Sequence, residues 1–344
     1  MRQTVILRED KEIYSPRTYV DLKADFAFKR MFGQPDGEAV LVAFLNALLG
    51  VANTETKITS ASILNTDLER EHEGDKKAVL DLLARTDRGD LTHVEIQVTG
   101  SPHLARRQLY YWSRIYAKQM EKGRPYSDLR RTISILISNV DVLPQTERYH
   151  SVFGLYEKQE HFPLTDVIEL HVIELQKLLR RAAKSEADPW TEPEIRWLLL
   201  LGAVQGGEVQ SKLMEKLEAI AMGGDLELLE AFGRWEDMSR DPKVWAKYEM
   251  WHKAMMDDAA YKAEMELLSA KTASLTAEAE SLKSETESLK SETESLKSEA
   301  ENLKSENTQM HARLLETGRT LLLNGMDAAE VARLTGLSPD ELEA

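Results

Sequence analysis

A leucine occupies every seventh position over a long stretch near the C-terminal end of the chain. The six leucines of this repeat are Leu268, Leu275, Leu282, Leu289, Leu296 and Leu303. The residues three positions before them are Met265, Thr272, Ala279, Thr286, Thr293 and Ala300. Two such positions in every seven residues are typical of an α-helix that supercoils with a partner helix. The repeat therefore predicts a long coiled coil, which we place at residues 251–315.

Charged residues flank this repeat in a regular order. With leucine at heptad position d, Glu285 and Glu292 fall at position g, and Lys290 and Lys297 fall at position e. Each glutamate precedes a lysine by five positions, which is the spacing that pairs two copies of a helix in a parallel coiled coil. We therefore expect a homo-oligomer. The alternative is a single solvated helix, because threonine at position a is a weak core residue.

The net charge of −15 is spread unevenly along the chain. Residues 257–306 hold 13 acidic and 6 basic side chains, whereas residues 1–140 hold 19 acidic and 21 basic ones. Within the latter, residues 101–131 hold 8 basic and 2 acidic side chains. The N-terminal part of the chain is therefore the part that can approach phosphate groups.

Several classes of protein are excluded by composition. The chain contains no cysteine, which rules out disulfides, thiolate metal sites and cysteine nucleophiles, and which fits a reducing cytoplasm. The N-terminal apolar stretch is too short for a signal peptide. The longest apolar run, from Trp197 to Leu201, is too short to span a bilayer. We expect a soluble, cytoplasmic protein without a membrane partner.

The spacing of apolar residues divides the part before the repeat into helices and strands. Helices are expected at residues 16–50, with a break at residues 33–37, and at residues 101–122, where Ser101-Pro102 forms the start. Strands are expected within residues 59–98 and at residues 132–140, 149–156 and 166–173, followed by helical sequence over residues 175–249 with breaks at Gly206-Gly207 and Gly223-Gly224. This order predicts an α/β (α+β) core with helices packed on a mixed sheet.

Five segments follow from these patterns. They are an N-terminal tail at residues 1–15, the sheet-containing core at 16–175, a helical extension at 176–250, the coiled coil at 251–315 and a small module at 316–344. The last segment resembles the first half of a helix-turn-helix. Its second helix would run only from Pro339 to Ala344 and carries three acidic residues, whereas a DNA-reading helix needs polar or basic side chains. We expect a module for packing or protein contact.

A predicted hairpin places two acidic residues side by side. The apolar strands on either side of Asp87-Arg88-Gly89 fit a three-residue loop with Gly89 in the left-handed conformation. If Arg88 is the centre of the loop, Asp81 faces Glu95, at a Cβ separation of about 4.5–5.5 Å. Two like charges at such a distance are destabilising unless a hard cation lies between them. The alternative is an edge hairpin with its polar face in water.

The two strands and the following helix add polar side chains to this pair. Alternation places His93, Glu95 and Gln97 on one face of the second strand. On the helix, Arg107, Tyr111, Arg114 and Lys118 form one stripe at helical spacing. A basic stripe with an aromatic residue suits a phosphate backbone, although an ordinary solvated helix face has the same pattern.

Six motifs in order resemble the Rpn family of recombination-promoting nucleases and transposases, which belongs to the PD-(D/E)XK nuclease superfamily. They are residues 25–33 (DFAFKRMFG), 44–49 (FLNALL), 80–81 (LD), 95–97 (EIQ), 107–111 (RQLYY) and 123–126 (GRPY). The resemblance runs over roughly residues 18–175, about half of the chain. It implies a mixed sheet flanked by helices and the cleavage of DNA phosphodiester bonds with Mg²⁺ or a similar cation such as Mn²⁺ or Ca²⁺.

The resemblance also implies roles for individual residues. Asp81 and Glu95 correspond to the metal-binding carboxylates of the family's motif, and Gln97 stands where most of the superfamily has lysine. Asp25 resembles the acidic residue of the first helix, and Arg107 and Tyr111 resemble the pair on the helix after the sheet.

The glutamine at position 97 weakens the expectation of full activity. A neutral Gln97 can orient water but adds no positive charge, which predicts modest turnover or a need for a second cation. Lys77 is a candidate for the missing charge, because alternation places it on the face of Asp81. The expected function is therefore that of a divalent-metal-dependent DNA endonuclease. The alternatives are a catalytically weak or inactive adaptor with a nuclease fold, which oligomerises through its coiled coil, and a transposase that also joins strands.

Overall fold

The computed structural model describes residues 18–64, 67–68, 78–100, 103–184, 189–338 and 340–341. The N-terminal tail expected at residues 1–15, the expected helix start at Ser101-Pro102, and Lys77 lie outside the described residues. The chain divides into two compact units, Met1–Met256 and Asp257–Ala344. The candidate site lies in the first.

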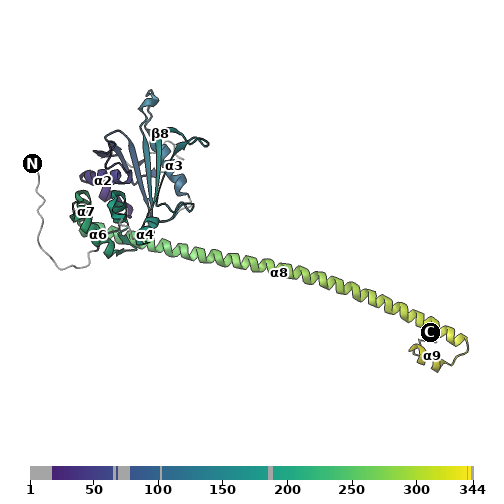
Figure 1. The fold of residues 1–344 in the computed structure, drawn as a ribbon. Coiled ribbons are helices and arrows are strands. Elements are labelled where there is room, and N and C mark those ends of the chain that lie inside the picture. The colour runs from purple at the N-terminus through teal and green to yellow at the C-terminus, as the bar shows by residue number, and fades with distance from the viewer. Residues whose placement is uncertain are drawn as a thin grey trace, which may run out of the picture. The chain divides into compact units, whose positions relative to one another are not determined.

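A mixed sheet forms the centre of the first unit (Figure 1). Among the described residues, six strands follow the spatial order β1-β4-β5-β6-β8-β7. They are β1 (Ala61–Ile63), β4 (Leu82–Thr86), β5 (Leu91–Gln97), β6 (Thr132–Ser138), β7 (His150–Tyr156) and β8 (Pro163–Glu174). The middle pairs β5–β6 and β6–β8 are parallel, and the outer pairs are antiparallel. Two short pairs, β2 (Asp67–Leu68) with β3 (Ala78–Val79) and β9 (Val204–Gln205) with β10 (Glu208–Val209), stand apart from this sheet. The expected mixed sheet is therefore confirmed.

Helices cover both faces of the sheet. Among the described residues, the α-helices that lie wholly within the first unit are α1 (Asp25–Phe32), α2 (Glu38–Leu48), α3 (Leu104–Lys118), α4 (Leu175–Lys184), α5 (Pro193–Leu201), α6 (Ser211–Met222) and α7 (Leu226–Arg240). On one face, Val94 and Ile96 of β5 belong to the main hydrophobic core with α1, α2, α5 and α7. On the other face, Leu83 and Leu91 pack against Ile115 of α3, which connects β5 to β6. Strand β5 is thus buried on both sides, between a large core and a small one.

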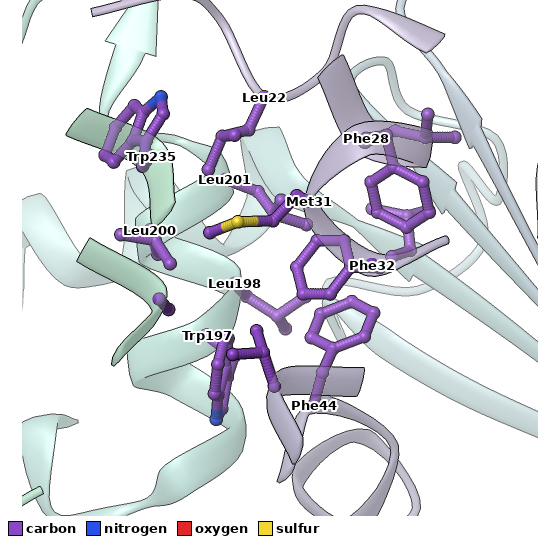
Figure 2. Close-up of a cluster of buried hydrophobic side chains, with 14 of the residues drawn as sticks. Leu22, Phe28, Met31, Phe32, Phe44, Trp197, Leu198, Leu200, Leu201 and Trp235 are labelled. Atoms are coloured by element: carbon purple, nitrogen blue, oxygen red, sulfur yellow. The ribbon is translucent and has the colours of Figure 1, made fainter. Parts of the chain in front are cut away.

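The large core is built from segments far apart in the sequence (Figure 2). Phe28 and Phe32 of α1 contact Phe44 of α2, and both Phe32 and Phe44 contact Trp197 of α5. The residues of α5 and α7 that sequence patterns assign to a helical extension therefore share one core with the first two helices.

The first helix begins later than its sequence pattern predicts, at Asp25 rather than residue 16. Among the described residues before it, the six from Tyr19 to Ala24 are all buried, whereas an amphipathic helix exposes one face to solvent. The backbone of Val20 bonds instead to α7, since its carbonyl accepts from Trp235 Nε1 at 2.8 Å and its N–H donates to Ser239 Oγ at 3.2 Å. Long-range packing therefore overrides the local helical pattern. The predicted break at residues 33–37 is confirmed by the end of α1 and a 3₁₀ turn at Pro35–Gly37.

The second unit contains most of α8 (Pro242–Leu323), one continuous helix that includes the whole heptad repeat, and the short helix α9 (Ala328–Thr335). Val331 and Leu337 are buried against residues near the end of α8, among them Leu314 and Leu321. Gly336 ends α9 in the left-handed conformation, at φ +72°. The segment of α9 and Leu337 therefore packs on the end of α8. None of the helices described is both long enough and apolar enough for a membrane span.

Candidate active site

The hairpin of β4 and β5 has the register that its sequence predicts. Leu82 pairs with Val94, and Leu83 pairs with His93. The connecting turn contains Gly89 at φ +87°, and the N–H of Gly89 donates to the Thr86 carbonyl at 2.9 Å. A side chain is strained at this φ, so glycine fits the turn. Thus the local turn chemistry determines which residues of β5 lie beside β4.

Extrapolation of the register beyond Leu82 predicts that Asp81 pairs with Glu95 across the ladder. In the structure Asp81 does not form this pair. The ladder ends at Leu82–Val94, and Leu80 lies in the same small core as Leu83, so alternation along the strand is interrupted at Asp81. The carboxylate of Asp81 accepts a hydrogen bond from the N–H of Ile96 at 3.0 Å. The carboxylate of Asp81 therefore takes the place of a backbone acceptor for the N–H of Ile96 in β5. Because Ile96 follows Glu95, this bond holds Asp81 next to Glu95.

The carboxylate of Glu95 is buried and accepts hydrogen bonds from two side chains, one from β5 and one from α3. Its Oε1 accepts from Arg107 Nη2 of α3 at 2.7 Å and from Gln97 Nε2 at 3.0 Å. Only 7% of the residue is exposed. The contacts confirm that Glu95 and Gln97 share one face of β5, and they add Arg107, which sequence reasoning assigned to DNA contact.

The electrostatics of both carboxylates favour protonation. Burial raises the pKa of Glu95 to about 7; the positive charge of Arg107 opposes this rise, and the negative charge of Asp81 adds to it. Burial also raises the pKa of Asp81, and the charge of Asp25 at the start of α1 contributes to that rise, while the Ile96 N–H and Lys29 oppose it. Three predicted acidic residues therefore interact electrostatically at one place in the fold.

Lys29 is a member of the site that sequence reasoning missed. Its Nζ lies 3.6 Å from Asp81 Oδ1. Lys29 is located one helical turn after Asp25 in α1, so the two side chains lie on the same side of the helix. The spacing of Asp25 and Lys29 could have revealed that they share a face, but only the packing of α1 beside the end of β4 brings Lys29 to Asp81.

His93 is fully buried beneath α3. Its Nδ1 lies 3.2 Å from Ser134 Oγ, and its ring makes an edge contact with Tyr111 at a centroid distance of 5.9 Å. Burial lowers the pKa of His93 to about 3, with a further contribution from Arg107. Within the described part of the chain, His93 Nε2 has no hydrogen-bond partner. A neutral histidine without access to solvent packs the site and is unsuited to accept a proton from water.

The predicted stripe on α3 lies along β5 but divides into parts with different surroundings. Arg107 contacts Glu95, and Tyr111 is half-buried against His93. Arg114 is half-buried as well. Lys118 is exposed and lines an open hollow with Arg85, Gly89, Leu91, Gln119, Glu121, Arg124, Asp128 and Arg130. The stripe therefore begins at the carboxylates and ends at a surface with four basic side chains.

Buried hydrogen bonds hold α3 in this position. Gln108 Nε2 donates to the carbonyls of Ser134 at 3.0 Å and His171 at 2.9 Å, and so joins the helix to β6 and β8. Trp112 Nε1 donates to the Thr132 carbonyl at 2.8 Å. The position of Arg107 over Glu95 is therefore determined by contacts along the whole helix.

The donor set fits a hard divalent cation that retains waters. Within the described ranges, no three His, Asp or Glu side chains form a group that could hold a metal ion. Mg²⁺ commonly binds through one or two carboxylates, with water and substrate phosphate as its other ligands. Asp81 and Glu95 offer two carboxylates of this kind, and burial raises the pKa of both.

Comparison with known proteins supplies an independent observation. A family model described as PD-(D/E)XK nuclease family transposase matches residues 22–265, which is more than half of the chain. No curated protein and no solved structure matches the sequence. The matched range includes the entire sheet, α1 to α7 and the first part of α8.

Proposed function

The chain belongs to the PD-(D/E)XK nuclease family transposases, and on that basis we propose that it is a divalent-metal-dependent endonuclease that hydrolyses DNA phosphodiester bonds. The observation that carries this proposal is the pair of carboxylates formed by buried Glu95 and half-buried Asp81. Asp81 bonds to the N–H of Ile96, the residue after Glu95, and the negative charge of Asp81 raises the pKa of Glu95. One or two carboxylates are the protein ligands through which Mg²⁺ commonly binds, with water and substrate phosphate as its other ligands.

Asp81 and Glu95 are the residues that would hold Mg²⁺, Mn²⁺ or Ca²⁺. The ion would polarise a phosphoryl oxygen and lower the pKa of a bound water. Arg107 and Gln97 orient the Glu95 carboxylate by donating to its Oε1. The guanidinium of Arg107 also favours the ionised form of Glu95, which is the form that binds a metal. Asp25 adds negative charge at the edge of the site.

Lys29 supplies the positive charge that Gln97 lacks. In most of the superfamily a lysine at the position of Gln97 stabilises the negative charge of the transition state. Here Lys29 lies on Asp81 from a different element, with one third of its side chain exposed. An ammonium group at this place can approach a phosphate bound to the same ion. Lys77, the earlier candidate, lies outside the described residues.

DNA would lie along α3, from the carboxylates toward the basic hollow at Lys118. The rise from Arg107 to Lys118 corresponds to about 16 Å of helix, which spans several phosphates of one strand. Lys118, Arg85, Arg124 and Arg130 would contact the backbone beyond the cut. Tyr111 lies between the two ends of this path, and Arg114 is the remaining basic member of the stripe.

The test is plasmid cleavage with and without Mg²⁺ by wild type, Asp81→Asn and Glu95→Gln. Both substitutions keep the shape of the side chain and remove its charge, so we expect loss of metal-dependent nicking. Asp87→Asn is the matched control, because Asp87 is an exposed carboxylate in the turn of the same hairpin and bonds to Thr59. Undiminished cleavage by Asp81→Asn would exclude Asp81 from the mechanism.

A second function is favoured by one specific observation. Arg107 already forms an ion pair with Glu95, and Gln97 is neutral, so the site has features of a nuclease fold that no longer cuts and acts as an adaptor. Calorimetric titration with Mn²⁺ separates the two functions, since an adaptor needs no metal. Strand joining by a transposase is distinguished by its products, when a DNA end with a free 3′-hydroxyl is supplied. In each case the heptad repeat of α8 would join copies of the chain.

A further inference from the structure

The heptad leucines of α8 form an apolar stripe that a single chain leaves in solvent. Leu275, Leu282 and Leu289 are each 55–56% exposed, and Leu303 is 60% exposed. Contiguous apolar surface of this length on a polar helix marks an interaction site. We refer to residues 265–310, with this stripe at their centre, as the seam.

We propose that the seams of two copies of this chain form a parallel, in-register, two-stranded coiled coil. This inference makes the proposed joining of copies specific in strand number, direction and register, and it rests on the heptad repeat whether or not the site cuts DNA. Three independent features of the seam support it: the charges beside the stripe, the hydroxyl groups within it and one asparagine near its end.

The charges beside the stripe select a parallel partner. The first g position of the seam, Lys271, faces the uncharged Thr276 at position e. From residue 278 to residue 304, position g holds Glu278, Glu285, Glu292 and Glu299, and position e holds Lys283, Lys290, Lys297 and Lys304. In a parallel pair each g residue faces the e residue five positions later in the other strand, so every one of these contacts joins glutamate to lysine. In an antiparallel pair g faces g and e faces e, which brings like charges together. The sequence of the seam is therefore complementary to itself in one direction only.

The threonines at position a can be buried without leaving an unpaired hydroxyl group. The hydroxyls of Thr272, Thr286 and Thr293 donate to the carbonyls four residues earlier, at 2.9, 2.7 and 2.7 Å. A hydroxyl that is already bonded within its own helix leaves no unpaired donor when a partner covers it. The remaining disadvantage of threonine in the core is that its side chain has little apolar volume. The leucines at position d supply most of the buried apolar surface.

Asn307 defines strand number and register. The heptad that places leucine at d places Asn307 at a and Met310 at the next d. A single asparagine at an a position favours two parallel strands in register, because its amide is paired only when it meets the same amide of the partner. A shift by one heptad would bury this polar group against Ala300 of the other strand.

The absence of cysteine from the chain allows a direct test by engineered disulfides. Leu275→Cys and Leu296→Cys place a thiol at position d, and Ser291→Cys places one at position f, on the outer side of the helix. In a parallel in-register pair, each d variant meets its own copy and forms a disulfide-linked dimer under mild oxidation, whereas Ser291→Cys stays monomeric on a non-reducing gel. If neither d variant forms a disulfide-linked dimer, the proposed register is wrong. It is also wrong if a disulfide forms only when the two d variants are mixed.

Light scattering measures strand number and direction on the full chain. We expect twice the chain mass of 39.1 kDa; a mass equal to one chain, or to three or more, contradicts the proposal. Glu285→Lys with Glu292→Lys should reduce the dimer to monomers, and so should Lys290→Glu with Lys297→Glu. Mixing these two variants should restore a dimer, because their charges are again complementary. None of these readouts depends on DNA cleavage, so failure of the nuclease proposal would leave them unaffected.

Discussion

Glu95 couples the stability of the metal-free protein to pH. Its pKa rises from 4.5 when unfolded to about 7 in the fold, which corresponds to roughly 3 kcal/mol. Between these values the folded state binds more protons than the unfolded state, so stability falls as pH rises from about 4.5 to 7. Glu95→Gln should remove this decline in chemical unfolding experiments.

The same residue predicts how metal affects stability. At pH 8 the carboxylates are ionised and repel each other, so Mn²⁺ should raise the melting temperature of the wild type. Glu95→Gln should show a much smaller rise, and Asp87→Asn should respond as the wild type does. Equal stabilisation of all three proteins would place the ion elsewhere.

Lys29 should affect catalysis more than metal binding. Lys29→Gln removes the positive charge beside Asp81, and we expect single-turnover cleavage to slow by about 10²-fold, the scale for loss of one group that stabilises transition-state charge. Mn²⁺ affinity should be unchanged or increased, since a competing cation is gone. Lys29→Arg should recover part of the rate.

Arg30→Gln is the control for Lys29, because Arg30 is the next residue of α1 and pairs with Asp241 instead. A rate for Lys29→Gln equal to that of Arg30→Gln would remove Lys29 from the mechanism.

At the residue scale, local chemistry determines which parts of the site sequence can predict. Turn preferences give the register of the hairpin and so bring Asp81 close to Glu95. The bond from Ile96 N–H to Asp81 depends on the interruption of strand alternation at Asp81. The pairing of Arg107 with Glu95 and the approach of Lys29 depend on how separate elements pack. Such contacts leave no periodic signal in the sequence.

At the scale of elements, α3 is positioned by its buried polar residue. Gln108 is 3% exposed and donates to two carbonyls. Gln108→Leu should lower the free energy of unfolding by roughly 2 kcal/mol, because the carbonyls of Ser134 and His171 lose a partner. Leu109→Ala, at an exposed neighbour, should change it little. Urea titrations measure both.

The elements themselves follow closely from the sequence where periodicity is strong. The strands β6, β7 and β8 and the helix α3 lie where apolar patterns predict them. The segment before α1 does not, because Lys23 donates to the Leu201 carbonyl and forms an ion pair with buried Asp21 at 2.8 Å. The bond to Leu201 forms only after α5 has packed, and no local pattern specifies it.

At the scale of the whole molecule, the proposed dimer would carry two candidate sites, and this predicts a particular order of products. A supercoiled plasmid held by both sites should give linear DNA early, without accumulation of nicked circles. Leu282→Glu with Leu289→Glu places charges in the seam and should yield monomers that first produce nicked circles. Ser284→Glu with Ser291→Glu adds the same charge at position f and should behave as the wild type. Identical product order for all three proteins would separate cleavage from dimerisation.

The contacts of Leu314 limit how far two helices can associate. Leu314 continues the heptad as the a residue after Asn307, but it packs against the module of Val331 and Leu337 within its own chain. The side chain of Leu314 cannot pack against this module and against a partner helix at the same time. Packing within the chain therefore competes with extension of the coiled coil at this residue. Removing the module by truncation after Leu323 should therefore lengthen the intermolecular contact and make the dimer harder to dissociate.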